Sequence, residues 1–109
     1  MTPAPFRVQR RESRQIKHFT VPTQVYFHDD PQQRQTILEL IATDRPGLLS
    51  KVGRAFSLCG VRLYNARIST IGSRAEDIFY LTGQDNLPLT DPAKIRELKG
   101  AIMGLVGAT

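Results

Sequence analysis

The segment DRPGLL is the part of this chain whose residue types best suit ligand binding. It joins an aliphatic run to an amphipathic one, and a strand-to-helix turn of this kind leaves backbone N–H groups without partners. Such amides and the helix dipole favour a carboxylate, and a glycine lets the ligand approach the backbone. A helix start that binds nothing is the alternative interpretation. The candidate residues are Asp44, Arg45, Pro46, Gly47, Leu48 and Leu49.

Asn65 is a second candidate, because its amide offers both a donor and an acceptor to an amino acid or to a glutamine side chain. The alternative is a strand residue that faces solvent or bonds to a neighbouring loop. Arg67 is expected to face Glu76 and Asp77 across a hairpin, in a surface ion pair worth about 0–1 kcal/mol.

Known catalytic patterns are missing from the sequence. There is no GxSxG elbow, no GxxxxGK[ST] loop and no HExxH helix. His18 and His28 are far from each other and from Cys59, so zinc-like spacing is absent as well. We therefore expect a non-catalytic chain with no catalytic residue, metal site or cofactor of its own.

Four strands follow from the alternation of apolar residues. They are predicted at residues 23–28, 36–43, 61–71 and 75–82, with turns at Asp29-Asp30-Pro31 and Gly72-Ser73. The second strand is expected to be central, with Leu38, Leu40 and Ala42 on one face.

Two helices are predicted from apolar residues at spacings of three and four. The first begins at Pro46 and ends at Gly60, and the second has Asp91 as its N-cap and Pro92 at its first position. Their expected buried stripes are Leu49, Val52, Phe56 and Cys59, and Ile95, Leu98, Ile102 and Leu105.

The order ββαββα predicts an α+β, ferredoxin-like sandwich, with a four-stranded antiparallel sheet and two helices on one face. A length of 109 residues fits one domain. We expect that domain at residues 23–109 and a basic linker or arm at residues 1–22. No strand is expected after the second helix, so the strand at 23–28 is expected to fill that edge of the sheet.

Composition and charge restrict the class of protein. Hydrophobic residues make up 40% and charged residues 23%, as in soluble globular chains, and no apolar run is long enough to span a membrane. With a single cysteine and no signal-like start, a cytoplasmic location is expected. Residues 1–22 carry five basic side chains and one acidic one, whereas residues 23–109 carry ten and nine. The arm thus carries +4 of the net charge of +5, and the nearly neutral domain does not indicate nucleic-acid binding.

The segments DRPGLLSKVGRAF, VRLYNARISTIG and AEDIFYLTG resemble ACT domains, the small-molecule sensors of amino-acid and nitrogen metabolism. Together with RQIKHF, they are similar to the last ACT domain of bifunctional uridylyltransferase/uridylyl-removing enzymes that modify the P-II nitrogen signalling protein. The resemblance covers residues from about Arg14 onward.

The resemblance implies glutamine sensing by the DRPGLL turn and Asn65, at a site between two ACT units. It also implies that catalysis and its Mg²⁺ ions belong to other domains of the parent enzyme. The expected partners are an amino acid, a second ACT domain and, for the parent enzyme, P-II; no membrane or nucleic acid is expected. A dimer is predicted in solution.

Two alternatives stay open. The chain is also compatible with an ACT interaction module of another enzyme, such as a stringent-response nucleotide synthetase. An RNA-binding sandwich would use aromatic side chains on an open sheet, and Tyr26, Tyr64 and Tyr80 are the candidates, although no RNP-like motif is present.

Overall fold

The computed structural model describes residues 21–107. The predicted basic arm at 1–22 therefore lies almost entirely outside the described residues. Two helices and five strands follow along the chain: β1 (Gln24–Asp30), β2 (Gln35–Thr43), α2 (Leu48–Cys59), β3 (Arg62–Arg67), β4 (Thr70–Ile71), β5 (Arg74–Thr82) and α3 (Pro92–Val106).

The strands form one antiparallel sheet in the order β1-β2-β5-β3, with β4 paired to the far part of β5. The prediction of four strands is wrong, because the strand expected at 61–71 is interrupted after Arg67. A register shift at Tyr64 disturbs β3, and the Ser69 amide donates to the side-chain carboxylate of Asp77 in β5 instead of to a backbone carbonyl. The Gly72-Ser73 turn between β4 and β5 is confirmed, with Gly72 at φ 62°.

The first strand occupies the sheet edge beside β2, as expected. It runs longer than predicted, because Asp29 and Asp30 pair with Thr36 and Gln35 and do not begin the turn. The turn lies at residues 31–34 and ends on Arg34, whose φ is 56°.

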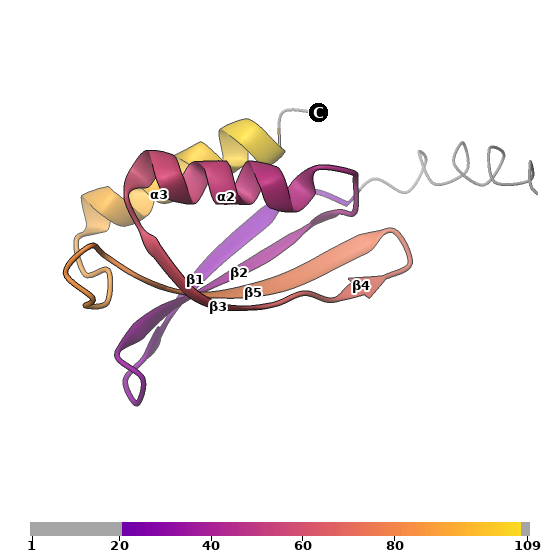
Figure 1. Ribbon diagram of the computed structural model, residues 1–109. Helices are drawn as coiled ribbons and strands as arrows, with labels where there is room; N and C mark the ends of the chain where they lie inside the picture. The colour runs from indigo at the N-terminus through magenta and orange to yellow at the C-terminus, as the bar shows by residue number, and fades with distance from the viewer. Residues whose placement is uncertain (1–20, 108–109) are drawn as a thin grey trace, which may run out of the picture.

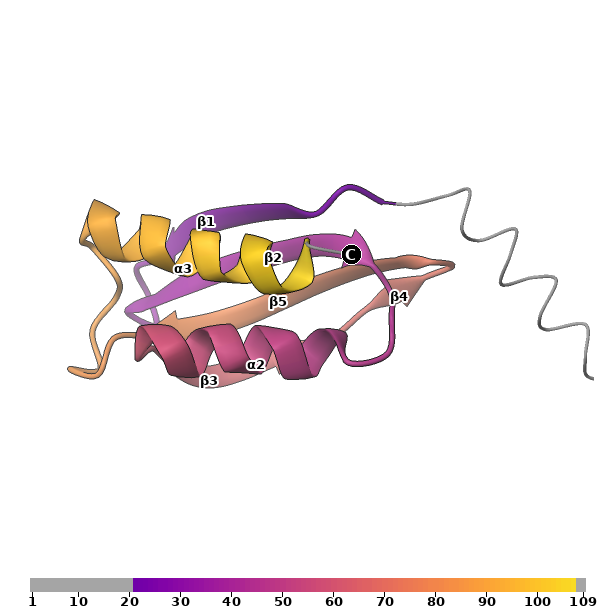
Figure 2. The ribbon, with the colours of Figure 1, turned by 90° about the horizontal axis from the view of Figure 1, so that it is seen from above.

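Both helices cover the same face of the sheet, as Figure 1 shows. Seen from above in Figure 2, α3 lies over the β1–β2 side and α2 over the β3 side. A two-layer α+β arrangement of this kind is compatible with a ferredoxin-like fold. The other face of the sheet is not covered by any helix among residues 21–107.

The core lies between the helices and the sheet. Leu38, Leu40 and Ala42 are buried as predicted, and the ring of Phe56 meets that of Phe79 edge-on at 5.3 Å. Other buried members include Val25, Val52, Ala55, Cys59, Leu81, Leu98 and Ile102.

The helix predictions are largely confirmed, with one error in the buried stripe. Asp91 caps α3 by accepting from the Ala93 amide at 2.9 Å, and Gly60 ends α2 at φ 67°. In α2, however, Leu48 is buried and Leu49 is 48% exposed. The stripe begins at Leu48, four residues before the buried Val52, so that both lie on one face of the helix.

No helix within residues 21–107 is long and apolar enough to cross a membrane.

Candidate functional site

The DRPGLL segment forms a tight turn before α2. The Leu48 amide donates to the Arg45 carbonyl at 3.1 Å, with Pro46 and Gly47 at the two central positions. Gly47 has φ 83° and ψ 2°, the values of the third residue of a type II turn. The prediction that Pro46 is the first helical residue is therefore wrong, because the left-handed Gly47 separates it from the helix.

Replacing Gly47 with alanine should lower the free energy of unfolding by about 1–2 kcal/mol, because an L-residue is strained at positive φ. The matched control is Gly53→Ala, inside α2. A Cβ atom at either position would meet no other atom within 4 Å, so only the backbone conformation differs. The control should stabilise the chain by about 0.5–1 kcal/mol. Urea unfolding of both variants measures this, and equal signs for the two changes would contradict the turn assignment.

The first turn of α2 presents free backbone donors. The helix has no side-chain cap and no acidic residue in its first turn. The Lys51 amide is bonded to the Gly47 carbonyl at 3.0 Å, whereas the amides of Leu49 and Ser50 have no protein acceptor within residues 21–107. These donors and the positive end of the helix dipole favour an anionic group.

A hollow of about 210 Å³ lies beside these amides. It is bounded by the turn, by the first residues of α2, by β4 with the residues before it, and by β5. The lining residues are Asp44, Arg45, Gly47, Leu48, Leu49, Ser50, Ile68, Thr70, Ala75 and Asp77.

Asp77 is the most unusual residue of this hollow, because its carboxyl group is ionisable and only 1% exposed. Its Oδ1 accepts from the Ser69 amide at 3.2 Å, while its Oδ2 has no hydrogen-bond partner among the described residues. Burial raises the pKa of the Asp77 carboxyl, the bond from Ser69 acts against this, and the negative charge of Asp44 adds to it. A buried carboxylate oxygen without a donor is costly, so it favours a donor from a ligand.

The expected surface pairing of Arg67 with Glu76 and Asp77 is wrong. Arg67 lies opposite Ile78, and Glu76 instead pairs with Arg74 at 2.6 Å. Asp77 was missed as a site residue, although the alternation of β5 contains the signal. Its neighbours at spacing two, Ala75 and Phe79, are buried, so Asp77 must point to the same side.

Asn65 does not reach this hollow in a single chain. It lies opposite Tyr80, whereas the next residue, Ala66, lies opposite the buried Phe79 and packs on the core. Asn65 is therefore on the sheet face away from the helices. It is exposed, and its Oδ1 accepts from the Ala66 amide at 2.9 Å.

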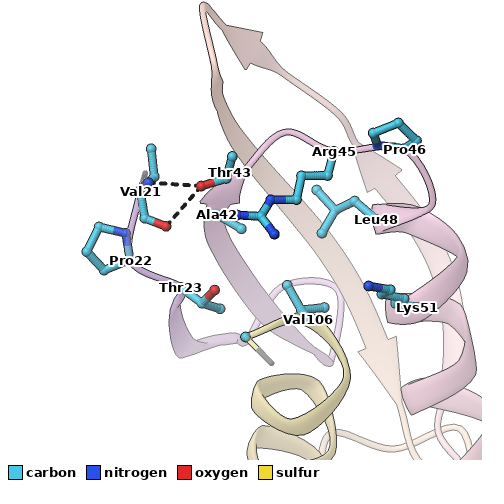
Figure 3. Close-up of a pocket in the computed structure, with 11 residues that line it drawn as sticks. Val21, Pro22, Thr23, Ala42, Thr43, Arg45, Pro46, Leu48, Lys51 and Val106 are labelled. Atoms are coloured by element: carbon cyan, nitrogen blue, oxygen red, sulfur yellow. Dashed lines mark hydrogen bonds between the residues drawn. The ribbon is translucent and has the colours of Figure 1, made fainter. Parts of the chain in front are cut away.

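The other predicted residues divide between two sides of the turn. Gly47 and Leu49 line only the hollow beside Asp77, together with the exposed Asp44, whose amide donates to the Ser73 carbonyl at 2.8 Å. Pro46 lines only a second, smaller hollow on the opposite side, shown in Figure 3. Arg45 and Leu48 line both hollows.

The described residues offer no group of three or more His, Cys, Asp or Glu side chains placed to hold a metal ion.

Fold and site together define a class of protein: a small antiparallel α+β domain with a hollow at the start of a helix. We call this hollow bipolar because it has free backbone donors on one side and a buried carboxyl group on another. No family model matches the chain. It is 60% identical over 103 residues to the bifunctional uridylyltransferase/uridylyl-removing enzyme of Methylococcus capsulatus, a match that covers 94% of this chain. The enzymes of the same name from Stutzerimonas stutzeri and Pseudomonas syringae pv. syringae are 51% and 46% identical over 88% and 91% of it.

The chain thus matches a fragment of bifunctional uridylyltransferase/uridylyl-removing enzymes, which confirms the resemblance seen in the sequence. It spans only 11–12% of the length of these relatives.

Proposed function

We propose that this chain is the amino-acid-sensing ACT module of a P-II uridylyltransferase/uridylyl-removing enzyme, with glutamine as its ligand and no catalytic activity of its own. The observation that carries the proposal is the bipolar hollow. Free amides of α2 line one side of it, and the buried Asp77 carboxyl, with an oxygen that lacks a partner within residues 21–107, lines another.

Each pole of a free amino acid has a complementary group in this hollow. The α-carboxylate would accept from the amides of Leu49 and Ser50, where the helix dipole adds about 0.3–1 kcal/mol. The α-ammonium would donate to the Asp77 carboxyl group, with a small movement of that side chain to present its buried Oδ2 to the ligand. Hydrogen bonds to charged groups contribute about 1.5–3 kcal/mol each, so these contacts suffice for recognition of a small ligand.

A second ACT unit would complete the site. β3 lies at the edge of the sheet, and Leu63, Tyr64 and Ile68 on or beside it are 49–50% exposed. An edge strand with apolar side chains favours pairing with another copy or with a neighbouring repeat. In such a pair, Asn65 of the second unit would supply the contact to the ligand side chain.

The proposed role of the module is regulatory. In the parent enzyme, glutamine would shift the balance between uridylyl transfer to P-II and uridylyl removal in the cytoplasm, by binding one arrangement of the domains more tightly than another. The catalytic groups and their metal ions would lie in the parts of the parent enzyme that this chain does not span.

Calorimetric titration of the chain at about 1 mM, a concentration that promotes pairing, tests the ligand. L-Glutamine should release or absorb heat and raise the unfolding temperature, because a ligand that binds only the folded state stabilises it. The control ligand is glutaramate, which keeps the carboxylate and the side-chain amide but lacks the ammonium. It should bind at least about tenfold more weakly, because it cannot donate to Asp77. A folded chain that shows neither heat nor stabilisation with any amino acid would contradict amino-acid sensing.

A further inference from the structure

The second hollow, shown in Figure 3, shares Arg45 and Leu48 with the hollow beside Asp77 and is otherwise lined by different residues. Its volume is about 120 Å³, and four parts of the chain bound it: the lead into β1, the end of β2, the first turn of α2 and the last turn of α3. The lining residues are Val21, Pro22, Thr23, Ala42, Thr43, Arg45, Pro46, Leu48, Lys51, Val106 and Gly107.

Two cationic side chains line this hollow. Figure 3 shows the guanidinium of Arg45 and the ammonium of Lys51 extending into the space beside Leu48 and Val106. Both residues are half-buried, and no acidic residue of the described segment 21–107 lines the hollow. Within residues 21–107, neither side chain forms an ion pair or donates a hydrogen bond. Two like charges in one partly desolvated space repel each other, so an anion bound in the hollow would be stabilised by both.

The surrounding structure offers only weak compensation for these charges. The carbonyl end of α3 meets the hollow at Val106 and Gly107, and its dipole is favourable to cations. Among the described residues, no carbonyl there accepts from the side chain of Arg45 or Lys51, and the Gly107 amide is bonded to the Met103 carbonyl at 3.0 Å. The Thr43 hydroxyl is also occupied, because it accepts from the Val21 amide at 2.9 Å and donates to the Val21 carbonyl at 3.2 Å.

We propose that this hollow binds a small oxyanion, a carboxylate or a phosphate, between Arg45 and Lys51. The space corresponds to roughly four water molecules, which suits such a group. The planar guanidinium of Arg45 can hold two oxygens of the anion at once. The ammonium of Lys51, which extends from α2, neutralises part of the anion's negative charge. The site is distinct from the amino-acid hollow, since Lys51 and the Val21–Thr23 segment line only this one.

Both hollows are lined by residues of the DRPGLL turn, so a ligand bound in the second hollow can affect binding in the first. Arg45 directs its side chain to the oxyanion site while its own segment bounds the hollow beside Asp77. An anion bound to Arg45 and Lys51 would fix the turn relative to α2 and so influence the amino-acid site. This coupling rests on the proposed function, whereas oxyanion binding itself does not.

The test is an NMR titration of the full chain with inorganic phosphate and, separately, with acetate, at constant ionic strength. Shifts should concentrate at residues 21–23, 43–51 and 106–107. Lys51→Met should weaken binding about tenfold or more, since it removes one charged hydrogen-bond donor but retains the length of the side chain. Lys51→Arg should keep the binding. The matched control is Arg54→Met, an exposed cation on the same helix that lines neither hollow.

The outcomes distinguish a phosphate ligand from a carboxylate ligand, and specific binding from non-specific attraction. Tighter binding of phosphate than of acetate would identify a phosphate-bearing ligand, and the reverse a carboxylate. Equal loss in Lys51→Met and Arg54→Met, or shifts spread over all basic residues, would overturn the proposal as non-specific attraction. Because glutamine binding is measured independently, failure of the amino-acid site leaves this result interpretable.

Discussion

Replacing Ile102 with alanine should lower the free energy of unfolding by about 2–5 kcal/mol, the cost of removing a large aliphatic side chain from a packed core. Ile102 lies in α3 and is 0% exposed, in the cluster that joins both helices to the sheet. For a domain of about a hundred residues, this is a large part of the total stability.

The neighbouring Met103 provides the matched control. It occupies the same helix but is 37% exposed, so Met103→Ala should cost much less, about 1 kcal/mol or below. Urea unfolding followed by circular dichroism measures both variants. The midpoint should fall for Ile102→Ala with an unchanged slope, because the surface exposed on unfolding is the same. Similar losses for the two variants would show that α3 does not pack through the Ile102 face.

Replacing Asp77 with asparagine should have opposite effects on binding and on stability. Under the proposed function it removes the charged acceptor for the α-ammonium, and the affinity for glutamine should fall about 10- to 100-fold. The same change should stabilise the unliganded chain at neutral pH, because it replaces a buried, half-satisfied carboxylate with a neutral amide. Such an exchange of stability for function is typical of binding sites.

The pH dependence of this stabilisation follows from the raised pKa of Asp77. The folded state binds the proton of Asp77 more tightly than the unfolded state, so ionisation penalises folding. The penalty is complete above the folded pKa and disappears as the pH falls toward the unfolded value of 3.8. The advantage of Asp77→Asn over the wild type should therefore be largest at neutral pH and vanish at low pH.

Glu76→Gln is the control for Asp77→Asn, since it removes the same charge from the adjacent residue. Glu76 forms a partly exposed ion pair with Arg74 and does not line the hollow beside Asp77. It should change neither glutamine affinity nor the difference in stability between neutral and low pH by a comparable amount. Calorimetry and thermal unfolding at several pH values distinguish the variants. A wild-type affinity in Asp77→Asn would exclude Asp77 from ligand recognition.

The sequence alone determined the types of the elements and most of the core. Alternation in residues 36–43 placed Leu38, Leu40 and Ala42 inside, and local chemistry placed the caps at Gly60 and Asp91. It also identified the DRPGLL turn as the segment of interest. These features depend on neighbours within a few residues, so propensity and periodicity are sufficient to predict them.

Only the tertiary structure decided which groups lack partners and where they meet. Nothing local to Asp77 shows that one of its oxygens is bonded to Ser69 while the other is left without a donor, or that Arg45 and Lys51 share a hollow with the end of α3. The sequence also did not show that Asn65 lies on the sheet face away from the helices, and so away from the DRPGLL segment. Whether a polar atom has a partner depends on segments distant in the chain, and the packing of helices on the sheet brings those segments together.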